Sequence, residues 1–199
     1  MWYMLGLGSN LAPRHHLPLL LRALFQLSPT LHLGRVVQTD PVGVVGDPFL
    51  NLPVCLQSDL TPPQLKRCCN ALEEALGRDR GAPDSKTRSR TADLDILFSL
   101  EPGAGRVSPA CLPREPYMRP MVLELLAYLA VETGLTVPPL PPGVPLPLGD
   151  LTVGAAPQTI ELVRGHQSPQ STVVRESTSR ESGAGAPHAD GVPTRFSLP

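Results

Sequence analysis

Short apolar runs and helical leucine patterns alternate along the first part of the chain. Residues 2–7 form an apolar run that Gly8 ends, which predicts a buried first strand closing into a tight loop. Leucines then recur at helical spacing over residues 17–27, which indicates an amphipathic first helix. We expect residues 36–37 to belong to a second strand and residues 49–56 to form a third.

The second amphipathic helix has the clearest start signal in the sequence. Thr61 is a suitable N-cap residue, prolines follow it in the first turn, and Gln64 completes a capping-box pattern. Gly77 is expected to end this helix. Residues 92–98 predict a fourth strand and residues 121–131 a third helix.

The order strand, helix, strand, strand, helix, strand is that of the split βαβ unit. We therefore predict an α+β protein, a ferredoxin-like βαββαβ sandwich with an additional C-terminal helix and a Pro-rich extension. Residues 1–165 would form this single domain, and within it six of the ten residues 138–147 are proline, which favours extended polyproline geometry. Residues 159–163 are a weak candidate for an edge strand. Residues 166–199 contain few apolar side chains, so we expect a disordered tail.

Composition limits the possible partners. The chain has 199 residues and a formal net charge of -1, so no global field draws it to nucleic acid or to a membrane. Its beginning lacks the pattern of a secretion signal, and no apolar stretch reaches the length of a membrane span. The four cysteines show no CxxC spacing and are expected to be reduced. We expect a soluble, cytoplasmic monomer that binds small molecules.

The clearest chemistry lies where a basic stretch meets two aspartates. Asp93 and Asp95 alternate with Leu94 on a predicted strand, so both carboxylates point to the same face. Such a pair suits Mg²⁺, a hard cation that prefers oxygen ligands. Cations that can bind a polyphosphate precede it in the sequence: Arg78, Arg80, Lys86, Arg88 and Arg90. A solvent-facing edge with ordinary salt bridges is the alternative interpretation of either feature alone.

Four short motifs follow one another along the chain. They are Leu7-Gly8-Ser9-Asn10, Thr39-Asp40-Pro41-Val42-Gly43, Phe49-Leu50-Asn51 and Arg90-Thr91-Ala92-Asp93-Leu94-Asp95-Ile96. In this order they resemble the hallmarks of the 6-hydroxymethyl-7,8-dihydropterin pyrophosphokinase family. The resemblance implies an ATP-dependent diphosphotransferase of folate biosynthesis, which transfers pyrophosphate from ATP to the hydroxymethyl group of the pterin and releases AMP.

The resemblance also implies roles for the residues at matching positions. Asp93 and Asp95 would hold two Mg²⁺ ions that bridge the phosphates of ATP, with Arg90 and Arg80 beside them as catalytic cations. Residues around the nucleotide would be Arg78, Arg80, Arg90 and Arg119. Residues contacting the pterin would be Thr39, Asp40, Val42, Phe49, Asn51 and Met121, of which Phe49 and Met121 would sandwich its ring. Glu73 aligns with a site-facing glutamate, and an exposed helix acid is the alternative.

Three departures from the family pattern keep other interpretations open. Residues 87–90 lack the usual tryptophan and glycine, residues 112–116 lack the usual histidine, and Met121 replaces a phenylalanine. A catalytically weak relative that still binds nucleotide or pterin is therefore one alternative. A ferredoxin-like interaction module whose Pro-rich segment binds a partner groove is the other. We also expect the loop at residues 79–89 to close over bound ATP, with Arg88 in place of the missing tryptophan.

Overall fold

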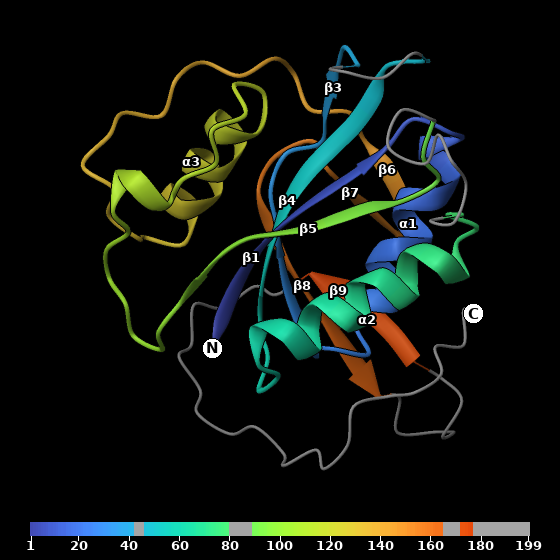
Figure 1. Ribbon diagram of the computed structural model, residues 1–199, viewed down its shortest axis with the longest axis horizontal. Coiled ribbons are helices and arrows are strands. Elements are labelled where there is room, and N and C mark those ends of the chain that lie inside the picture. The colour runs from blue at the N-terminus through green and yellow to red at the C-terminus, as the bar shows by residue number, and fades with distance from the viewer. Residues whose placement is uncertain (42–45, 80–88, 165–171, 177–199) are drawn as a thin grey trace.

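The protein combines one antiparallel sheet with three α-helices. The computed structural model describes residues 1–41, 46–79, 89–164 and 172–176 (Figure 1). The elements in chain order are β1 (Trp2–Ser9), α1 (Pro13–Leu24), β2 (Thr30–Leu33), β3 (Val37–Thr39), β4 (Phe49–Gln57), α2 (Pro62–Ala75), β5 (Asp93–Leu100), a 3-10 turn (Pro109–Cys111), α3 (Met118–Tyr128), β6 (Leu146–Leu148), β7 (Leu151–Val153), β8 (Gln158–Arg164) and β9 (Thr172–Glu176).

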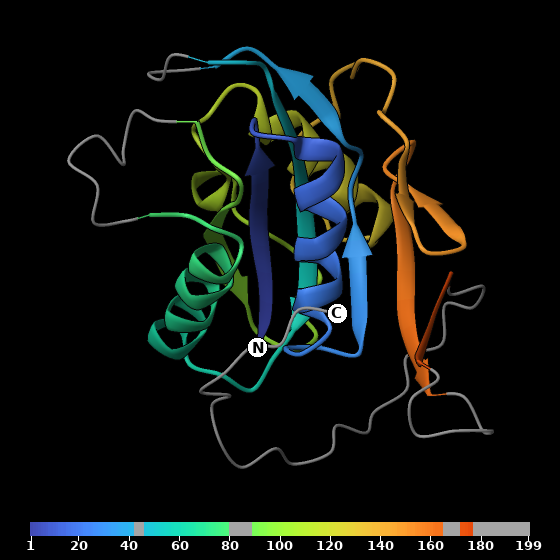
Figure 2. The same cartoon turned by 90° about the vertical axis from the view of Figure 1, so that its right-hand side faces the viewer.

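The main sheet has the strand order β5-β1-β4-β2-β8-β9, and the short β3 also pairs with β4. Helices α1 and α2 pack on one face over alternate residues of the central strands, such as Tyr3, Leu5 and Leu7 of β1. Helix α3 lies on the opposite face, where it packs with Met4 and with Cys55 of β4 (Figure 2). The sheet therefore has a buried core on each side, and β1, β4 and β5 contribute side chains to both.

The strand expected around residues 36–37 is interrupted on its N-terminal side, where Gly34 lies beside Pro53 of β4. Gly34 donates its N–H to the carbonyl of Pro53, and a Cβ on Gly34 would lie 2.5 Å from the Pro53 ring. Only glycine fits beside this ring, and β2 ends there before β3 resumes pairing with β4. Val36 lies in the break, so the expected position of the second strand is correct only for Val37.

The helix boundaries depend on local capping. In α2, Gln64 accepts a hydrogen bond from the backbone N–H of Thr61 at 2.8 Å, and Gly77 follows the helix with φ 90°, as the sequence predicts. Helix α3 is three residues earlier than expected, because Ala130 takes a left-handed conformation with φ 57° and ends the helical hydrogen bonding. Helix α1 likewise begins before Leu17 and ends at Leu24.

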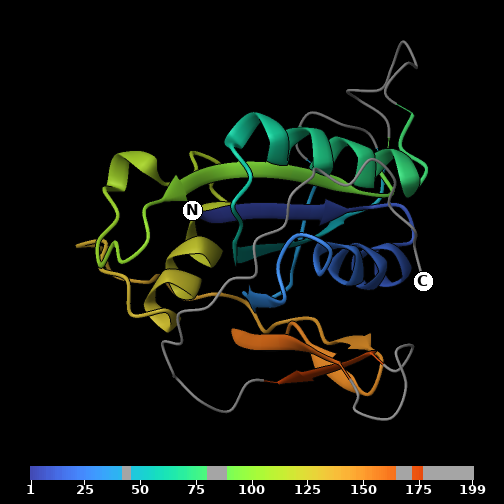
Figure 3. The ribbon, with the colours of Figure 1, turned by 90° about the horizontal axis from the view of Figure 1, so that it is seen from below.

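The C-terminal part of the described chain adds strands to the far end of the sheet. The Pro-rich segment runs into β6, whose Leu146 is fully buried in the core beneath α1. Strand β8 pairs with β2 and also with β9, which makes β9 rather than β8 the edge (Figure 3). The expectation of a disordered tail is therefore wrong for residues 172–176, whereas residues 165–171 and 177–199 lie outside the described residues.

Two further sequence expectations concern cysteines and membrane spans. All four cysteines are free, and Cys55, Cys68 and Cys69 are buried. Burial raises the pKa of the Cys55 and Cys69 thiols to about 12, so both are neutral and unreactive at physiological pH. Within the described ranges, no helix is both long enough and apolar enough to cross a bilayer.

Candidate functional site

One row of residues crosses the face of the sheet on which α3 packs. The strand register places Asp93 of β5 opposite Gly8 of β1, Gly8 opposite Asn51 of β4, and Asn51 opposite Val37 of β3. Because neighbouring strands lie about 4.8 Å apart, the backbones of Asp93 and Asn51 are about 10 Å from each other across a glycine. A carboxylate and a carboxamide thus stand on either side of a glycine, and the Asn51 carboxamide lies over the place where a Gly8 side chain would be.

The two aspartates share this face, as their alternation predicts. Leu94 between them points to the opposite face, where it belongs to the core under α1 and α2. The residue opposite Asp95 is Gly6, so each aspartate has a glycine beside it on β1. The two glycines keep the space next to both carboxylates free of neighbouring β1 side chains.

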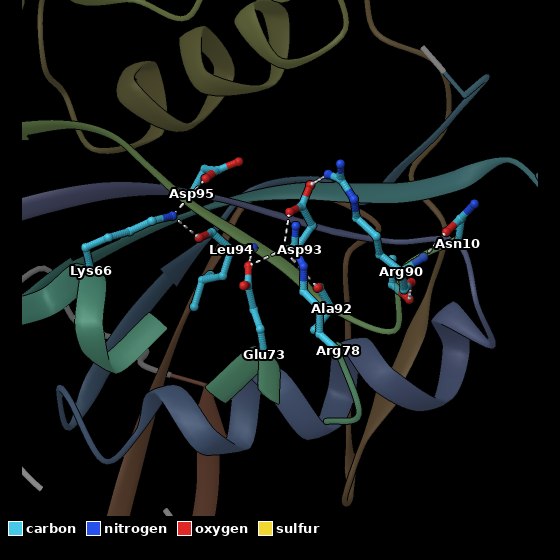
Figure 4. Close-up of polar contacts among 10 residues, drawn as sticks. Asn10, Lys66, Glu73, Arg78, Arg90, Ala92, Asp93, Leu94 and Asp95 are labelled. Atoms are coloured by element: carbon cyan, nitrogen blue, oxygen red, sulfur yellow. Dashed lines mark hydrogen bonds and ion pairs between the residues drawn. The ribbon is translucent and has the colours of Figure 1, made fainter. Parts of the chain in front are cut away.

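Asp93 is held by two arginines from different segments (Figure 4). Arg78, which follows α2, donates to Asp93 Oδ1 at 2.6 Å, and Arg90 pairs with the Oδ2 atom. The three side chains are between 14% and 22% exposed, so water screens these ion pairs only partly. The cluster joins the segment that follows α2 to the segment that leads into β5.

Glu73 anchors this cluster from within the core. Its side chain is completely buried, and Oε1 accepts hydrogen bonds from Arg78 at 2.7 Å and from the backbone N–H of Leu94 at 2.6 Å. The alternative of an exposed helix acid is therefore wrong. A buried carboxylate is stable only with such charge-assisted partners, and here they fix Arg78 in the orientation that reaches Asp93.

Asp95 has a different partner and a different degree of exposure. Lys66 of α2 lies 3.0 Å from Asp95 Oδ1, and the same ammonium donates to the carbonyl of Leu94 at 3.2 Å. The side chain of Asp95 is 63% exposed and that of Lys66 is 41% exposed. This ion pair faces water and is correspondingly weak.

Asn10 ties the two loops at the end of the site to β1. Its side chain is buried, accepts from the backbone N–H of Arg90 at 2.7 Å and donates to the carbonyl of Asp47 at 3.2 Å. Its amide also donates to the hydroxyl of Ser89 at 3.3 Å. The stem of the loop before β4 and the stem of the loop before β5 therefore meet at a single amide.

The residues expected to contact a pterin are partly brought together. Asn51 donates to the hydroxyl of Thr39 at 2.7 Å, and Phe49 lies two residues away on the same face of β4, with 9% of its surface exposed. Met121 is fully buried in α3, so it can touch a ligand only after neighbouring side chains move. Asp40 is exposed, and Val42 lies outside the described residues.

The expected nucleotide-binding cations are less completely described. Arg78 and Arg90 converge on Asp93, whereas Arg119 is half-buried in the first turn of α3. Three further cations of the predicted set lie outside the described residues: Arg80, Lys86 and Arg88. Most of the expected lid, residues 80–88, also lies outside them.

Asp93 and Asp95 are the candidate metal ligands of this site. In the described part of the chain, no group of three or more His, Cys, Asp or Glu side chains could hold a metal. Asp93 and Asp95 together supply hard oxygen donors from one face, which fits Mg²⁺ when phosphate oxygens and water complete its coordination. The donor set therefore suits a metal that arrives with a polyphosphate.

Sequence reasoning gave no role to three residues of this site, although Asn10 is the last residue of the first motif. Lys66 and Asn10 contact the site through their side chains, and the pKa of the half-buried Tyr117 phenol is raised by burial, by Glu115 and by both aspartates. The seven-residue spacing of Lys66 and Glu73 on α2 is the signal that could have revealed Lys66, because such residues lie on one side of a helix. No comparable signal exists for Tyr117.

Comparison with known proteins gives two findings. The family model described as 7,8-dihydro-6-hydroxymethylpterin-pyrophosphokinase (HPPK) matches residues 4–132. Over 100 residues the chain is 37% identical to a 2-amino-4-hydroxy-6-hydroxymethyldihydropteridine pyrophosphokinase of Porphyromonas gingivalis, which covers 47% of this chain and 66% of that protein. A protein of the same name from Bacillus subtilis is 34% identical over 98 residues, covering 47% of this chain and 57% of the relative. The chain thus spans just under two thirds of the length of the first of these relatives.

Proposed function

The chain belongs to the 7,8-dihydro-6-hydroxymethylpterin-pyrophosphokinase family, and we propose that it transfers pyrophosphate from ATP to 6-hydroxymethyl-7,8-dihydropterin. AMP is the second product. The observation that carries the proposal is the row Asp93, Gly8 and Asn51, in which a carboxylate held by two arginines and a carboxamide share one face of the sheet and stand on backbones about 10 Å apart. A polyphosphate suits the first end of this row and a flat heterocycle with donors and acceptors suits the second.

At the phosphate end, the residues bind and neutralise charge. Arg78 and Arg90 present guanidinium groups beside Asp93, and guanidinium geometry matches phosphate oxygens. Asp93 and Asp95 would hold Mg²⁺, which would neutralise charge on the phosphates when bound. We extend the proposal to two ions, because two carboxylates with separate partners offer two anchoring points.

At the pterin end, the residues orient the ring. The Asn51 carboxamide offers both a donor and an acceptor to a ring edge, and its bond to Thr39 fixes which atoms face the site. Phe49 supplies an apolar surface beside it, and Met121 would supply the opposite one after side-chain movement.

The reaction balances without a covalent intermediate. The hydroxymethyl oxygen of the pterin attacks the β-phosphorus of ATP. The bond between this phosphorus and the oxygen that bridges it to the α-phosphorus breaks, and AMP leaves with that oxygen. The hydroxyl proton is released. Catalysis then rests on alignment of the two substrates and on charge neutralisation by fixed cations, which are effects that a preorganised site can supply.

The proposal also includes the fold class, the oligomeric state and the cellular location. The strand order β5-β1-β4-β2, with α1 and α2 on one face, supports a ferredoxin-like core to which β6–β9 are added. We propose that the enzyme acts as a monomer in the cytoplasm, on ATP and a reduced pterin.

The test is AMP formation from purified protein, ATP, Mg²⁺ and 6-hydroxymethyl-7,8-dihydropterin. We expect one AMP for each pterin pyrophosphate formed, and no AMP when the pterin is omitted. Binding of both substrates without AMP formation would instead support the catalytically weak relative that residues 87–90 and 112–116 suggest. Absence of binding and of turnover would contradict the proposal.

A further inference from the structure

Lys66 approaches the site from outside the sheet. Helix α2 packs on the face that carries Leu94, whereas Asp95 points to the opposite face. Strand β5 is the last strand at this end of the sheet, so a long side chain from α2 can pass around its free edge. Figure 4 shows the Lys66 side chain extending from α2 to the carboxylate of Asp95.

Lys66 and Glu73 together hold the residue between the two aspartates. Lys66 donates to the carbonyl of Leu94 at 3.2 Å, and Glu73 accepts from its N–H at 2.6 Å. The N–H and the carbonyl of Leu94 lie on the edge of β5 that pairs with no other strand among the described residues. The backbone contact keeps the Lys66 ammonium beside Asp95 independently of its bond to the carboxylate.

The two aspartates differ in how firmly their charges are neutralised. Asp93 is 22% exposed and is held by Arg78 and Arg90, which are 14% and 21% exposed. The Asp95 carboxylate is 63% exposed, and its Lys66 partner is 41% exposed. Water and ions therefore reach the second pair readily, and its partners can exchange.

We propose that Lys66 is a built-in counter-ion that competes with a divalent cation for Asp95. In the protein without nucleotide, the ammonium neutralises the carboxylate and limits binding of a free metal ion. Metal that arrives with ATP displaces the ammonium from Oδ1, while Lys66 keeps its bond to the Leu94 carbonyl. The inference rests on the proposed function, because it takes Asp95 as a metal ligand.

The consequence is a coupling between metal and nucleotide. A free divalent cation gains only the net attraction of Asp95 after repulsion by Lys66, whereas a cation bound to triphosphate brings compensating negative charge. Lys66 thereby disfavours a site filled by metal alone and favours the metal–nucleotide complex. Arg67, the next residue along α2, is exposed and points about 100° around the helix from Lys66, which makes it a suitable control.

The experiment measures Mn²⁺ binding to nucleotide-free protein by electron paramagnetic resonance, which detects free Mn²⁺. Lys66→Met keeps an unbranched side chain one atom shorter than lysine and removes its charge, and we expect it to tighten Mn²⁺ binding by about threefold to tenfold. Lys66→Arg and the control Arg67→Met should bind Mn²⁺ as the parent does. Asp95→Asn should bind it more weakly.

Each other result overturns the inference. Unchanged Mn²⁺ affinity in Lys66→Met excludes competition, and weaker binding assigns Lys66 to holding the carboxylate in place. An equal gain in Mn²⁺ affinity in Arg67→Met would show that the effect comes from the net positive charge of α2 and not from contact between Lys66 and Asp95. Equal binding by Asp95→Asn and the parent removes the metal site itself. AMP formation by the parent protein is assayed in parallel, so failure of the inference and failure of the proposed function are seen separately.

Discussion

Asp93 and Asp95 stand in such different surroundings that their asparagine variants should behave differently. Either change should lower kcat by roughly a thousandfold, because several kcal/mol of charge neutralisation at the phosphates are lost. Asp93→Asn should also lower the free energy of unfolding by about 1–3 kcal/mol, since Arg78 and Arg90 lose a partly buried partner. Asp95→Asn loses only an exposed pair and should unfold as the parent does.

The measurements are steady-state AMP formation and urea unfolding of both variants. Turnover within a few-fold of the parent in either variant would contradict the metal assignment. Equal stability of the two variants would contradict the contrast between a fixed and an exchangeable carboxylate.

Gly8 is the residue that leaves room for the Asn51 carboxamide. A Cβ at position 8 would lie 2.6 Å from Asn51 Oδ1, a distance at which the amide must move away from Thr39. Gly8→Ala should therefore raise the KM for the pterin more than tenfold, since a misplaced ligand contact costs about 1.4 kcal/mol or more. Binding of an ATP analogue should change much less.

The matched control is Gly105→Ala, because a Cβ there meets nothing within 4 Å. Calorimetric binding of the pterin and of α,β-methylene-ATP distinguishes the two ends of the site. An equal loss of both affinities in Gly8→Ala would indicate a general distortion of the sheet instead.

His32 should make the fold sensitive to acid. Burial lowers its pKa from 6.5 to about 4, while its ring packs on Trp2 and Nδ1 contacts the hydroxyl of Thr159 at 2.8 Å. The unfolded chain therefore binds a proton at this residue more readily than the folded chain does. Stability should be fully present above pH 6.5 and should fall toward pH 4, by at most about 1.4 kcal/mol per pH unit from this group. His32→Gln should reduce that slope in urea unfolding measured from pH 7 to pH 4.5, and an unchanged slope would contradict the assignment.

At the scale of elements, one ion pair joins three segments that are distant in sequence. Arg35, in the break between β2 and β3, binds Glu124 of α3 at 2.6 Å and donates to the carbonyl of Pro141 at 3.0 Å. Both side chains are mostly buried, and the pairing raises the pKa of Arg35, so the guanidinium stays charged. The pair thus fixes α3 and the Pro-rich segment against the strands that lead to Thr39.

Arg35→Met should lower the free energy of unfolding by about 1.5–3 kcal/mol, the value of a hydrogen bond to a charged group. It leaves the Glu124 carboxylate half-buried without its partner. Glu124→Gln keeps the shape and one acceptor and should cost less. The double variant should cost less than the sum of the two single changes, because both remove the same interaction. Additive effects in urea unfolding would show that Arg35 and Glu124 act separately.

At the scale of the whole molecule, the sequence predicted the parts that depend on local pattern. The apolar run of β1, the capping of α2 and the alternation of Asp93 and Asp95 are local signals, and the structure confirms them. Contacts made across the sheet carry no such signal. Lys66 reaches Asp95 because β5 is the edge strand, and β2 ends at Leu33, just before Gly34, because Pro53 lies beside that glycine.

The C-terminal error has the same physical origin. A segment poor in apolar residues reads as disordered when it is considered alone, yet β9 pairs with β8 through the backbone, and β8 is itself placed by β2. Backbone pairing needs no hydrophobic side chains once an edge is available. The placement of β9 therefore follows from the sheet. The β-branched run at residues 172–174 favours a strand locally, but the average composition of residues 166–199 conceals it.

Two truncations distinguish the contribution of β9 from that of the residues after it. Removing residues 177–199 deletes a segment rich in Ser, Gly, Pro and Ala, and composition predicts no change in the midpoint of thermal unfolding or in AMP formation. Removing residues 165–199 also deletes β9, which pairs with Ile160 to Arg164, and exposes the edge of β8. Loss of this pairing should cost about 1–2 kcal/mol, which lowers the midpoint by roughly 2–8 °C for a chain of this size.

AMP formation at 25 °C should survive both truncations, because the aspartates lie at the opposite end of the sheet, on β5. The second variant should also associate more readily, since an uncovered strand edge can pair with another molecule. Size-exclusion chromatography beside calorimetry tests this, and identical midpoints for the two truncated proteins would mean that β9 does not stabilise the sheet.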